Sequence, residues 1–439
     1  MASNFDMSEF LNDFNALGKY TCIDEVMYRW NGNNWTVLTD KYGEAEVLAW
    51  LKEQAPHNVS RSTARNAWGT LKLDLLCDSG RAAESGALIP CQGTYVRVSE
   101  RGELTTISPS QELQCTYALS CTYESAAEAP MFARFLEQIL PDEELRKRVQ
   151  EFVGYTLLGD HRYQCAGMWL GSGANGKGVL SNIVQALHQE VAAIQLDNKS
   201  RFALSGLHRA SLIVADELPP SKLDEGRLKS VTAGEPVFID IKGETPITTR
   251  VRGKLLVLGN NFPTVNDASD GFWRRWEVIP FQITIPPEQR NPKLAEQIIK
   301  TELSGVLNWA IEGLQRLLRR DGFDPVRPEA MNLAIKTAKM VADDVTGWLA
   351  DRVETLAGPV TVKKTMVYAD YHRWCTANDF TPRAPQGFWL KLKRCRTDMT
   401  AKKVRIHGGA TLNACSIVLK PEVEPDLCAV PFEHLALAA

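Results

Sequence analysis

The sequence has no long hydrophobic run, no C-x-x-C pair and little excess of either charge. Its 439 residues contain no stretch of about 18 consecutive apolar side chains, so we expect no membrane-spanning helix. The N-terminal segment lacks a basic stretch followed by an apolar core, so we expect no secretory signal. With a net charge of −3 and 44% hydrophobic residues, the composition is typical of a soluble, cytoplasmic protein of two or three domains.

The ten cysteines are scattered along the chain, which argues against a disulfide framework or a zinc site. The closest pair, Cys115 and Cys121, has no histidine near it in the sequence. We therefore expect reduced, buried cysteines. The sequence also contains no internal repeat and no low-complexity tract.

Changes of pattern divide the chain into four segments. Residues 1–85 mix helix-like stretches with an aromatic hairpin signal around Asn31–Asn33, as in a small α+β domain. Residues 86–160 begin with short hairpins and continue with two amphipathic helices, the second starting near Asp142. Over 161–343 strands alternate with helices, which predicts an α/β domain with a parallel sheet. Residues 344–439 form a separate C-terminal domain.

Residues 171–178, "GSGANGKG", have the spacing of a phosphate-binding loop. The apolar run "CAGMWL" precedes them and the helical pattern "GKGVLSNIVQALHQE" follows, so the loop opens a helix whose N–H groups favour phosphate. Gly178 stands where a serine or threonine hydroxyl normally holds magnesium, and Ser181 is a weaker substitute. A chance glycine-rich turn is the alternative. The residues expected to contact the nucleotide are Gly171, Gly173, Asn175, Gly176, Lys177 and Gly178.

Two further apolar strands end in polar residues. "SLIVADE" ends in Asp216 and Glu217, and charges at the end of a buried strand are costly unless they are used. In an NTPase the first would hold Mg²⁺ through water and the second would orient the attacking water. "KLLVLGNN" ends at Asn260 and Asn261, and the Asn260 side chain could lie beside the γ-phosphate. A strand that simply runs into an acidic loop is the alternative.

Two cationic features lie near these strands. Arg274 and Arg275 sit among aromatic residues in "GFWRRWEVIPF", and rigidly held guanidinium groups suit the stabilisation of phosphate charge. The alternative is an arginine pair that is simply exposed on the surface. Between the strands, "VFIDI" and "ITTRVRG" could pair as a hairpin with Lys242 at its tip. A solvated turn explains that tip equally well.

The C-terminal segment is locally basic. Residues 361–406 contain eleven lysines and arginines against three aspartates, a net charge of +8. Two predicted helices and a Gly–Gly hairpin follow the order of a winged helix-turn-helix. We expect the second helix to contact DNA, although a solvated charged surface is the alternative. Its candidate DNA-binding residues are Lys391, Lys393, Arg394 and Arg396.

The order of the motifs resembles that of the superfamily 3 helicases. The segments "GSGANGKG", "LIVADE", "LKSVTAGEPVFIDIK", "LLVLGNNFP" and "GFWRRWEVIPF" follow one another as in the helicase portion of phage, plasmid and poxvirus primase-helicases. Upstream, "FARFLEQILPDEELRKRVQEFVGYTLLGD" is similar to the domain that precedes the motor in those proteins, and "VYADYHRWCTANDFTPRA" resembles their C-terminal winged helix. The resemblance covers roughly residues 85–420.

The resemblance implies a role for each candidate residue. Lys177 would be the Walker A lysine and Asn260 sensor 1. Asp216 and Glu217 would be the Walker B pair, with Asp216 holding Mg²⁺. The resemblance further implies that one of Arg274 and Arg275 serves a neighbouring subunit as an arginine finger, and that Lys242 grips DNA. The helices at 128–158 would form a collar.

The expected protein is therefore an AAA+ P-loop ATPase with an α+β N-terminal region, a helical collar and a winged-helix C-terminal domain. We expect an ATP- and Mg²⁺-dependent helicase or replication initiator of a mobile genetic element in a bacterial host cell. It would form a homo-oligomer, a hexameric ring, on single-stranded, forked or duplex DNA, with host or element replication proteins as further partners. An initiator that melts an origin without processive unwinding is the alternative. Since residues 1–80 lack paired acids and zinc cysteines, we expect no primer synthesis.

Overall fold

A computed structural model describes the chain except for a set of short segments and the C-terminal end. The described residues are 5–77, 86–196, 200, 204–218, 225–241, 246–260, 270–354, 362–378, 380–399, 401–405 and 411–420. Lys242 lies outside them. The chain forms two compact units, the first comprising 1–219, 224–261 and 274–331 and the second comprising 220–223, 262–273 and 332–439.

The first unit begins with a small α+β module, as the sequence predicts. Its elements are α1 (Met7–Ala16), β1 (Tyr20–Ile23), β2 (Val26–Trp30), β3 (Trp35–Val37), α2 (Asp40–Gln54), α3 (Arg61–Asp74) and β4 (Leu76–Cys77). The sheet order is β3-β2-β1-β4, and the predicted hairpin around Asn31–Asn33 is confirmed because it joins β2 to β3. Trp68 is buried between the helices, against Gly43 of α2, where a side chain would overlap its ring.

A three-stranded antiparallel sheet and two helices follow. The sheet contains β5 (Ala87–Pro90), β6 (Tyr95–Val98) and β7 (Leu104–Ile107). The helices are α4 (Pro130–Ile139) and α5 (Glu143–Thr156). Asp142 caps α5 by accepting bonds from the N–H groups of Glu144 and Leu145, which confirms the predicted start of this helix.

The centre of the unit is a five-stranded parallel sheet. Its strands, in the order β14-β8-β13-β10-β9, are β14 (Trp276–Pro280), β8 (Ala166–Leu170), β13 (Lys254–Gly259), β10 (Leu212–Ala215) and β9 (Val191–Ala193). Every residue of β8, β10, β13 and β14 is buried, as expected for parallel strands covered on both faces. Two helices, α6 (Lys177–Ala186) and α7 (Glu225–Ala233), and the hairpin β11 (Pro236–Ile239)–β12 (Ile247–Arg250) connect the strands. The predicted α/β sheet is confirmed.

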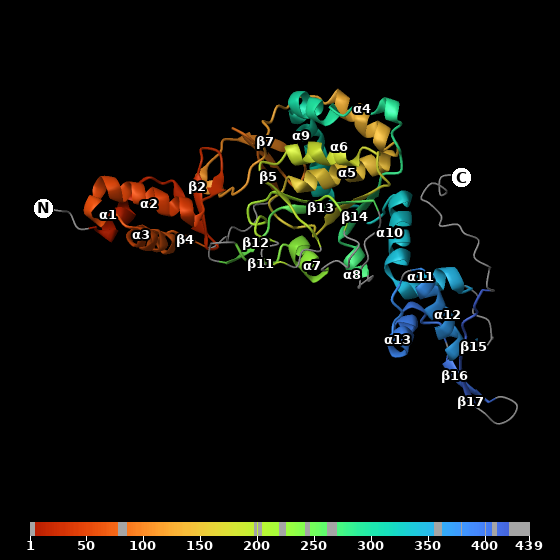
Figure 1. Ribbon diagram of the computed structural model, residues 1–439. Helices are drawn as coiled ribbons and strands as arrows, with labels where there is room; N and C mark the ends of the chain where they lie inside the picture. Colours follow the sequence, from red (N-terminus) through yellow and green to blue (C-terminus); the bar gives the residue numbers. More distant parts are fainter. Residues whose placement is uncertain are drawn as a thin grey trace. The chain divides into compact units, whose positions relative to one another are not determined.

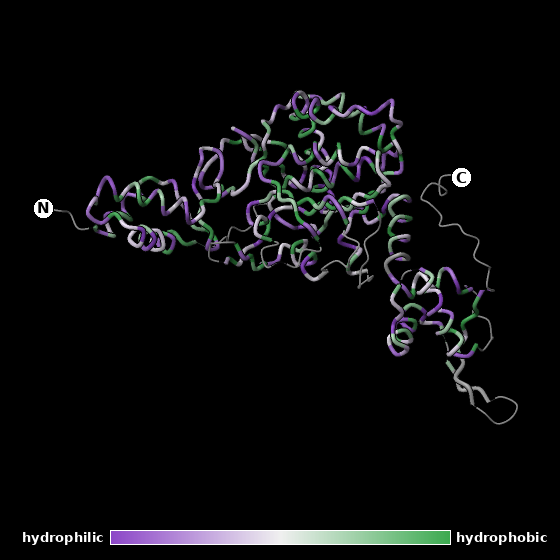
Figure 2. Tube along the Cα trace, viewed as in Figure 1, coloured by the Kyte–Doolittle hydropathy of each residue, from purple (hydrophilic) through white to green (hydrophobic). Residues whose placement is uncertain are grey.

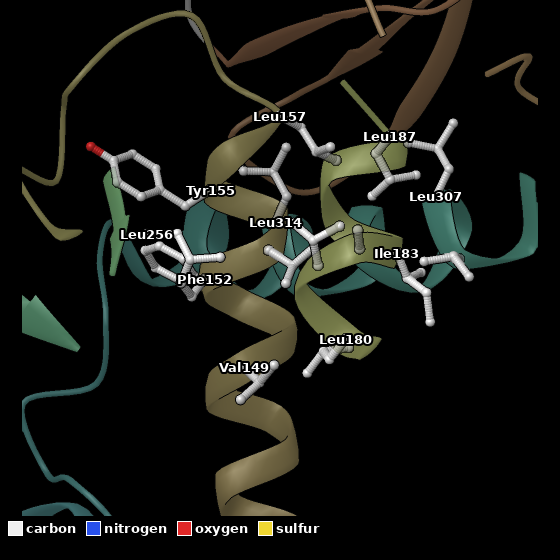
Figure 3. Close-up of a cluster of buried hydrophobic side chains, with 14 of the residues drawn as sticks. Val149, Phe152, Tyr155, Leu157, Leu180, Ile183, Leu187, Leu256, Leu307 and Leu314 are labelled. Carbon is white, nitrogen blue, oxygen red and sulfur yellow. The ribbon is translucent and has the colours of Figure 1, made fainter. Parts of the chain in front are cut away.

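A layer of helices covers one side of this sheet, and α7 lies on the other side (Figure 1). The long helix α9 (Leu294–Arg320) packs against α4, α5 and α6, and apolar side chains from α5, α6 and α9 meet in the core (Figure 3). Hydrophobic and hydrophilic residues are interspersed along these helices (Figure 2), and α5 is buried on all sides from Arg148 to Thr156. The Glu302 carboxylate of α9 accepts bonds from the N–H groups of Met131 and Phe132 at 3.0 and 2.9 Å, which caps α4.

Glycines allow α5 and α9 to approach closely. A Cβ on Gly154 would lie 2.5 Å from the Ala310 carbonyl oxygen, and a Cβ on Gly313 would overlap the Gln150 carbonyl oxygen. Nearby, Glu151 of α5 forms ion pairs with Arg316 and Arg320 of α9 at 3.3 and 2.8 Å.

The second unit is a small domain of helices and a three-stranded sheet. It contains α8 (Asp270–Trp273), most of α10 (Glu329–Ala342), α11 (Asp344–Arg352), β15 (Val362–Lys363), α12 (Lys364–Ala377), α13 (Pro385–Cys395), β16 (Ala401–Arg405) and β17 (Thr411–Cys415). The predicted helix–helix–hairpin order is confirmed in α12, α13 and β16–β17. Two elements were not predicted: helix α11, and strand β15, which completes the sheet in the order β15-β17-β16. Two residues are too short a strand to give a periodic pattern.

A buried polar network holds the helices of the second unit together. The Tyr371 hydroxyl of α12 donates to Asp344 at the start of α11, and Arg383 forms an ion pair with the same carboxylate at 2.8 Å. The Trp348 indole donates to Asp370 at 2.7 Å. Aromatic rings form a small core around Tyr371 and Phe388, which stack with their centroids 4.3 Å apart.

Within the described part of the chain, no helix is both long enough and apolar enough to cross a membrane.

The α5–α9 contact generates a stability prediction. Gly313→Ala should destabilise the full chain by about 1–3 kcal/mol, because the added methyl group forces the two backbones apart. Gly69→Ala in α3 is the matched control. No atom lies within 4 Å of its added methyl group, so it should stabilise the chain by roughly 0.5–1 kcal/mol. Urea unfolding measures both changes, and a Gly313→Ala protein as stable as the control would contradict the packing argument.

Candidate functional site

Three predicted site segments meet at one edge of the central sheet. In the parallel register, Leu170 of β8 pairs with Gly259 of β13, and Ala215 of β10 pairs with Val257. The loop after β8, Asn260 after β13 and the two acids after β10 therefore leave the sheet side by side. The carboxyl ends of parallel strands are the usual position of ligand sites in α/β folds.

Lys177 connects the loop to Asn260 at this edge of the sheet. Its side chain is buried, and Nζ donates to the Gly171 carbonyl oxygen at 2.9 Å and to Asn260 Oδ1 at 2.7 Å. Burial lowers the pKa of Lys177 because the charged form loses its hydration. The loop lysine and the residue predicted as sensor 1 are thus in direct contact, although 83 residues separate them in the sequence.

The loop itself is curled. Gly173, Ala174 and Gly176 have positive φ angles of 103°, 50° and 78°, a conformation in which successive N–H groups can form an anion-binding concavity. Gly176 also has no room for a side chain, since a Cβ would lie 2.5 Å from Ile139. Helix α6 begins directly at Lys177, and the first N–H groups of a helix have no partner within it.

Contacts that were not predicted hold the loop in place. The Asn175 side chain accepts from the Lys177 N–H at 3.3 Å and donates to the Phe281 carbonyl oxygen at 3.4 Å. The Ile285 N–H donates to the Ala174 carbonyl oxygen at 2.8 Å. The segment after β14 is therefore the outer support of the loop.

Gly178, the departure from the loop pattern, lies in open space. A Cβ at this position would meet no atom within 4 Å, so packing does not explain the missing hydroxyl. Ser181, the suggested substitute, is buried, and its hydroxyl accepts a bond from Gln185 at 3.1 Å. Its position inside α6 makes it a poor replacement for an exposed metal ligand.

Asp216 and Glu217 lie exposed just beyond β10. The next residue, Leu218, anchors them, because its side chain occupies the space that a side chain on Gly259 would need. Among the described residues no three His, Cys, Asp or Glu side chains gather into a metal-binding group. One or two carboxylates fit magnesium in a nucleotide site, since the remaining ligands there are phosphate oxygens and water.

The arginine pair lies at the amino end of the parallel strands, opposite the end that carries the loop. Arg275 directly precedes β14, and its carbonyl oxygen accepts from the N–H of Ala166, the first residue of β8, at 2.8 Å. The five residues of β8 separate this point from the loop, a distance of about 16 Å at roughly 3.3 Å per residue. Arg274 is exposed, and the aromatic residues predicted to flank the pair, Phe272, Trp273 and Trp276, are buried. Within one chain the structure does not bring these arginines to Lys177.

The predicted hairpin between the strands is present. Strands β11 and β12 pair antiparallel, with Ile239 opposite Ile247. Lys242, expected at its tip, lies outside the described residues.

The basic residues of α13 fall into two groups. Lys391 forms an ion pair with Asp343 at 3.2 Å, and Arg396 forms a two-bonded pair with Asp398 at 2.8 and 2.7 Å. Lys393 and Arg394 are exposed, on the same face as Leu390, which is 59% exposed. Only the second pair therefore lies on the outward face of the helix.

Comparison with known proteins gives partial matches. Residues 169–275 match the profile of DUF5906, described as a family of unknown function. This range includes the loop, both acids, Asn260 and the arginine pair.

Relatives among curated proteins come from large DNA viruses. "Putative helicase L207/L206" of Acanthamoeba polyphaga mimivirus is 29% identical over 161 residues, which are 34% of this chain and 16% of that protein. "Putative helicase 184R" of Invertebrate iridescent virus 6 is 26% identical over 204 residues, 43% of this chain and 21% of that protein. "Putative helicase 022R" of Frog virus 3 is 24% identical over 300 residues, 61% and 30% of the two chains. The chain thus spans less than a third of these relatives, and they give no support to a bacterial host.

The fold has a counterpart among solved structures. The apo structure of the NrS-1 C-terminal region aligns with a TM-score of 0.54 over 95% of this chain and 100% of that chain, at 10% identity. At this identity the match concerns the fold alone.

Proposed function

We propose that the chain is an ATP-dependent DNA helicase motor of the superfamily 3, AAA+ type. The observation that carries this proposal is the contact of Lys177 with Asn260 at the sheet edge where Asp216 and Glu217 also emerge. The viral relatives of low identity that are named as helicases also support a helicase-like function. The wider assignment, to replication of a mobile element, rests on the resemblance of the motifs.

The geometry suggests how the site would act on ATP. The loop N–H groups and the start of α6 would hold phosphate oxygens, and Lys177 would exchange one of its present acceptors for the β- and γ-phosphates. Glu217 would orient the attacking water, with Asn260 beside it. Magnesium, when bound near Asp216, would neutralise charge on the phosphate oxygens.

The position of the arginines favours an oligomer. Arg274 and Arg275 lie about 16 Å of strand away from the loop of their own chain, so a finger from this pair would have to act on a neighbouring subunit. A ring of subunits, such as the hexamer that the resemblance implies, meets this requirement. An initiator that only melts an origin would use the same ATP site, and strand displacement on a forked substrate separates the two functions.

We also propose that the second unit is a winged helix that binds duplex DNA through α13. The order α11–β15–α12–α13–β16–β17 supports this, as do Lys393 and Arg394 on the outward face. Lys391 and Arg396 are committed to ion pairs, so their proposed role becomes support of α13 instead of direct DNA contact.

Two substitutions test the ATP site. Lys177→Ala should abolish ATP hydrolysis, because it removes the only loop cation aimed at the phosphates. Glu217→Gln should retain nucleotide binding but stop turnover, since the amide cannot orient and activate water as a carboxylate does. Steady-state hydrolysis and binding of a fluorescent ATP analogue are the measurements. Hydrolysis by Glu217→Gln at the wild-type rate would show that another residue orients the water.

Mixing experiments test the arginine pair. Arg274→Ala or Arg275→Ala should lower turnover by roughly 10³–10⁵-fold if the residue is the finger. Mixing that variant with Lys177→Ala should restore part of the activity, because a mixed interface joins an intact loop to an intact arginine. No recovery with either arginine variant would exclude a finger shared between subunits.

Salt titrations test α13. The double variant Lys393→Gln/Arg394→Gln should weaken duplex binding and reduce the slope of log affinity against log salt by about 0.9 per lost phosphate contact. Lys52→Gln/Arg61→Gln, which removes the same two charge types from exposed positions of the first unit, is the matched control. Equal slopes for the two variants would mean that α13 does not contact DNA.

A further inference from the structure

A cavity of the first unit lies away from the proposed ATP site. It has a volume of about 540 Å³ and is confined to the first unit. Its walls come from the sheet β5–β7, the segment before β8, and the two ends of the hairpin β11–β12. Because the segments before β8 and β13 line it, the cavity is at the sheet edge opposite Lys177. ATP held by the loop therefore would not fill it.

Arginines dominate its polar lining. The charged residues are Arg97, Arg162, Arg250 and Arg252 against Asp24 and Asp160, a surplus of two positive charges. His161 adds no charge, because burial lowers its pKa to about 3. A cavity of this size is within the usual range for small-ligand sites, and guanidinium groups suit phosphate recognition.

The arginines differ in whether their partners within the protein carry a negative charge. Arg162 is neutralised, since it forms a two-bonded pair with Asp160 at 2.8 and 2.6 Å. Arg250 donates to the Gly234 carbonyl oxygen at 2.7 Å, and Arg252 donates to the Tyr28 hydroxyl at 3.4 Å. Those acceptors carry no negative charge, so they orient the two guanidinium groups and leave their charge available to a ligand.

A buried lysine, whose pKa burial lowers to about 7, connects the segments that carry these arginines. Lys254, the first residue of β13, is fully buried and donates to the Leu158 and Arg252 carbonyl oxygens at 2.6 and 3.0 Å. Both acceptors belong to residues that line the cavity. The segment of Arg252 is therefore tied to the segment before β8, which makes the site preorganised.

We propose that this cavity binds the phosphate of a nucleotide unit, and that the unit belongs to the nucleic-acid strand on which the motor acts. The inference rests on the proposed function for the choice of a strand as the phosphate source. Gly234 precedes β11 and Arg250 ends β12, so the cavity lies at the base of the hairpin that carries Lys242 at its tip in sequence. A strand that ran along the hairpin from its tip to its base would bring phosphates to Arg250 and Arg252.

The test is the double variant Arg250→Gln/Arg252→Gln with Arg61→Gln/Arg65→Gln, two exposed arginines of α3, as the matched control. Labelled single-stranded oligothymidylate should bind the cavity variant about tenfold more weakly than the control near 0.1 M salt. Its salt slope should be smaller by about 0.7 per lost phosphate contact. ATP hydrolysis without DNA should stay at the wild-type level, and it should depend on Lys177 in both proteins.

Four other results would decide against the proposal or against one of its parts. Equal affinities and slopes for cavity variant and control would overturn the proposal. If thymidine monophosphate binding is lost while oligothymidylate binding is kept, the phosphate comes from a free nucleotide and the strand is the wrong source. Should the double variant unfold, Arg252→Lys keeps the charge without the fork, and undiminished oligothymidylate binding by it would count against a bidentate phosphate contact. Absent hydrolysis by the wild type would contradict the proposed function and leave this binding comparison readable on its own.

Discussion

The parallel register of β8, β13 and β10 is the constraint on which the rest of the structure depends. It fixes Gly171, Asn260 and Asp216 at the same edge although they lie far apart in the sequence. A shift of one residue in β13 would point its side chains to the opposite face and would separate Asn260 from Lys177. The burial of every residue in these strands makes such a shift expensive, because each would exchange a packed neighbour for a void or a clash.

Much of the site could be predicted because short sequence motifs indicate it. A glycine-rich loop between an apolar strand and a helix, and acids at the end of another apolar strand, each limit the possible structures severely. The parallel sheet follows from the alternation of strands and helices, and parallel strands bring their carboxyl ends together. Thus the neighbourhood of Lys177, Asp216, Glu217 and Asn260 was predictable without knowledge of any contact.

The features that sequence could not give are those that depend on partners distant along the chain. Nothing local shows that Asn175 is held by the Phe281 carbonyl or that Lys391 pairs with Asp343, since the partners are 106 and 48 positions away. A count of positive charges treated all four basic residues of α13 alike, whereas the structure commits half of them to carboxylates. The position of the arginine pair could not be predicted either. The pattern "GFWRRW" indicates rigid side chains, but it does not show at which end of the parallel strands they lie.

Strand β13 connects the two edges of the sheet. At its carboxyl end Asn260 accepts the bond from Lys177, and at its amino end Lys254 ties Arg252 to the Leu158 carbonyl. If nucleotide phosphates replaced Asn260 as the partner of Lys177, as the proposed function requires, the change would fall at the carboxyl end of a six-residue strand that is buried along its whole length. The same strand follows directly on the hairpin β11–β12, so its amino end lies next to the cavity arginines. The fold therefore offers a short route along β13 from the proposed ATP site to the proposed phosphate site.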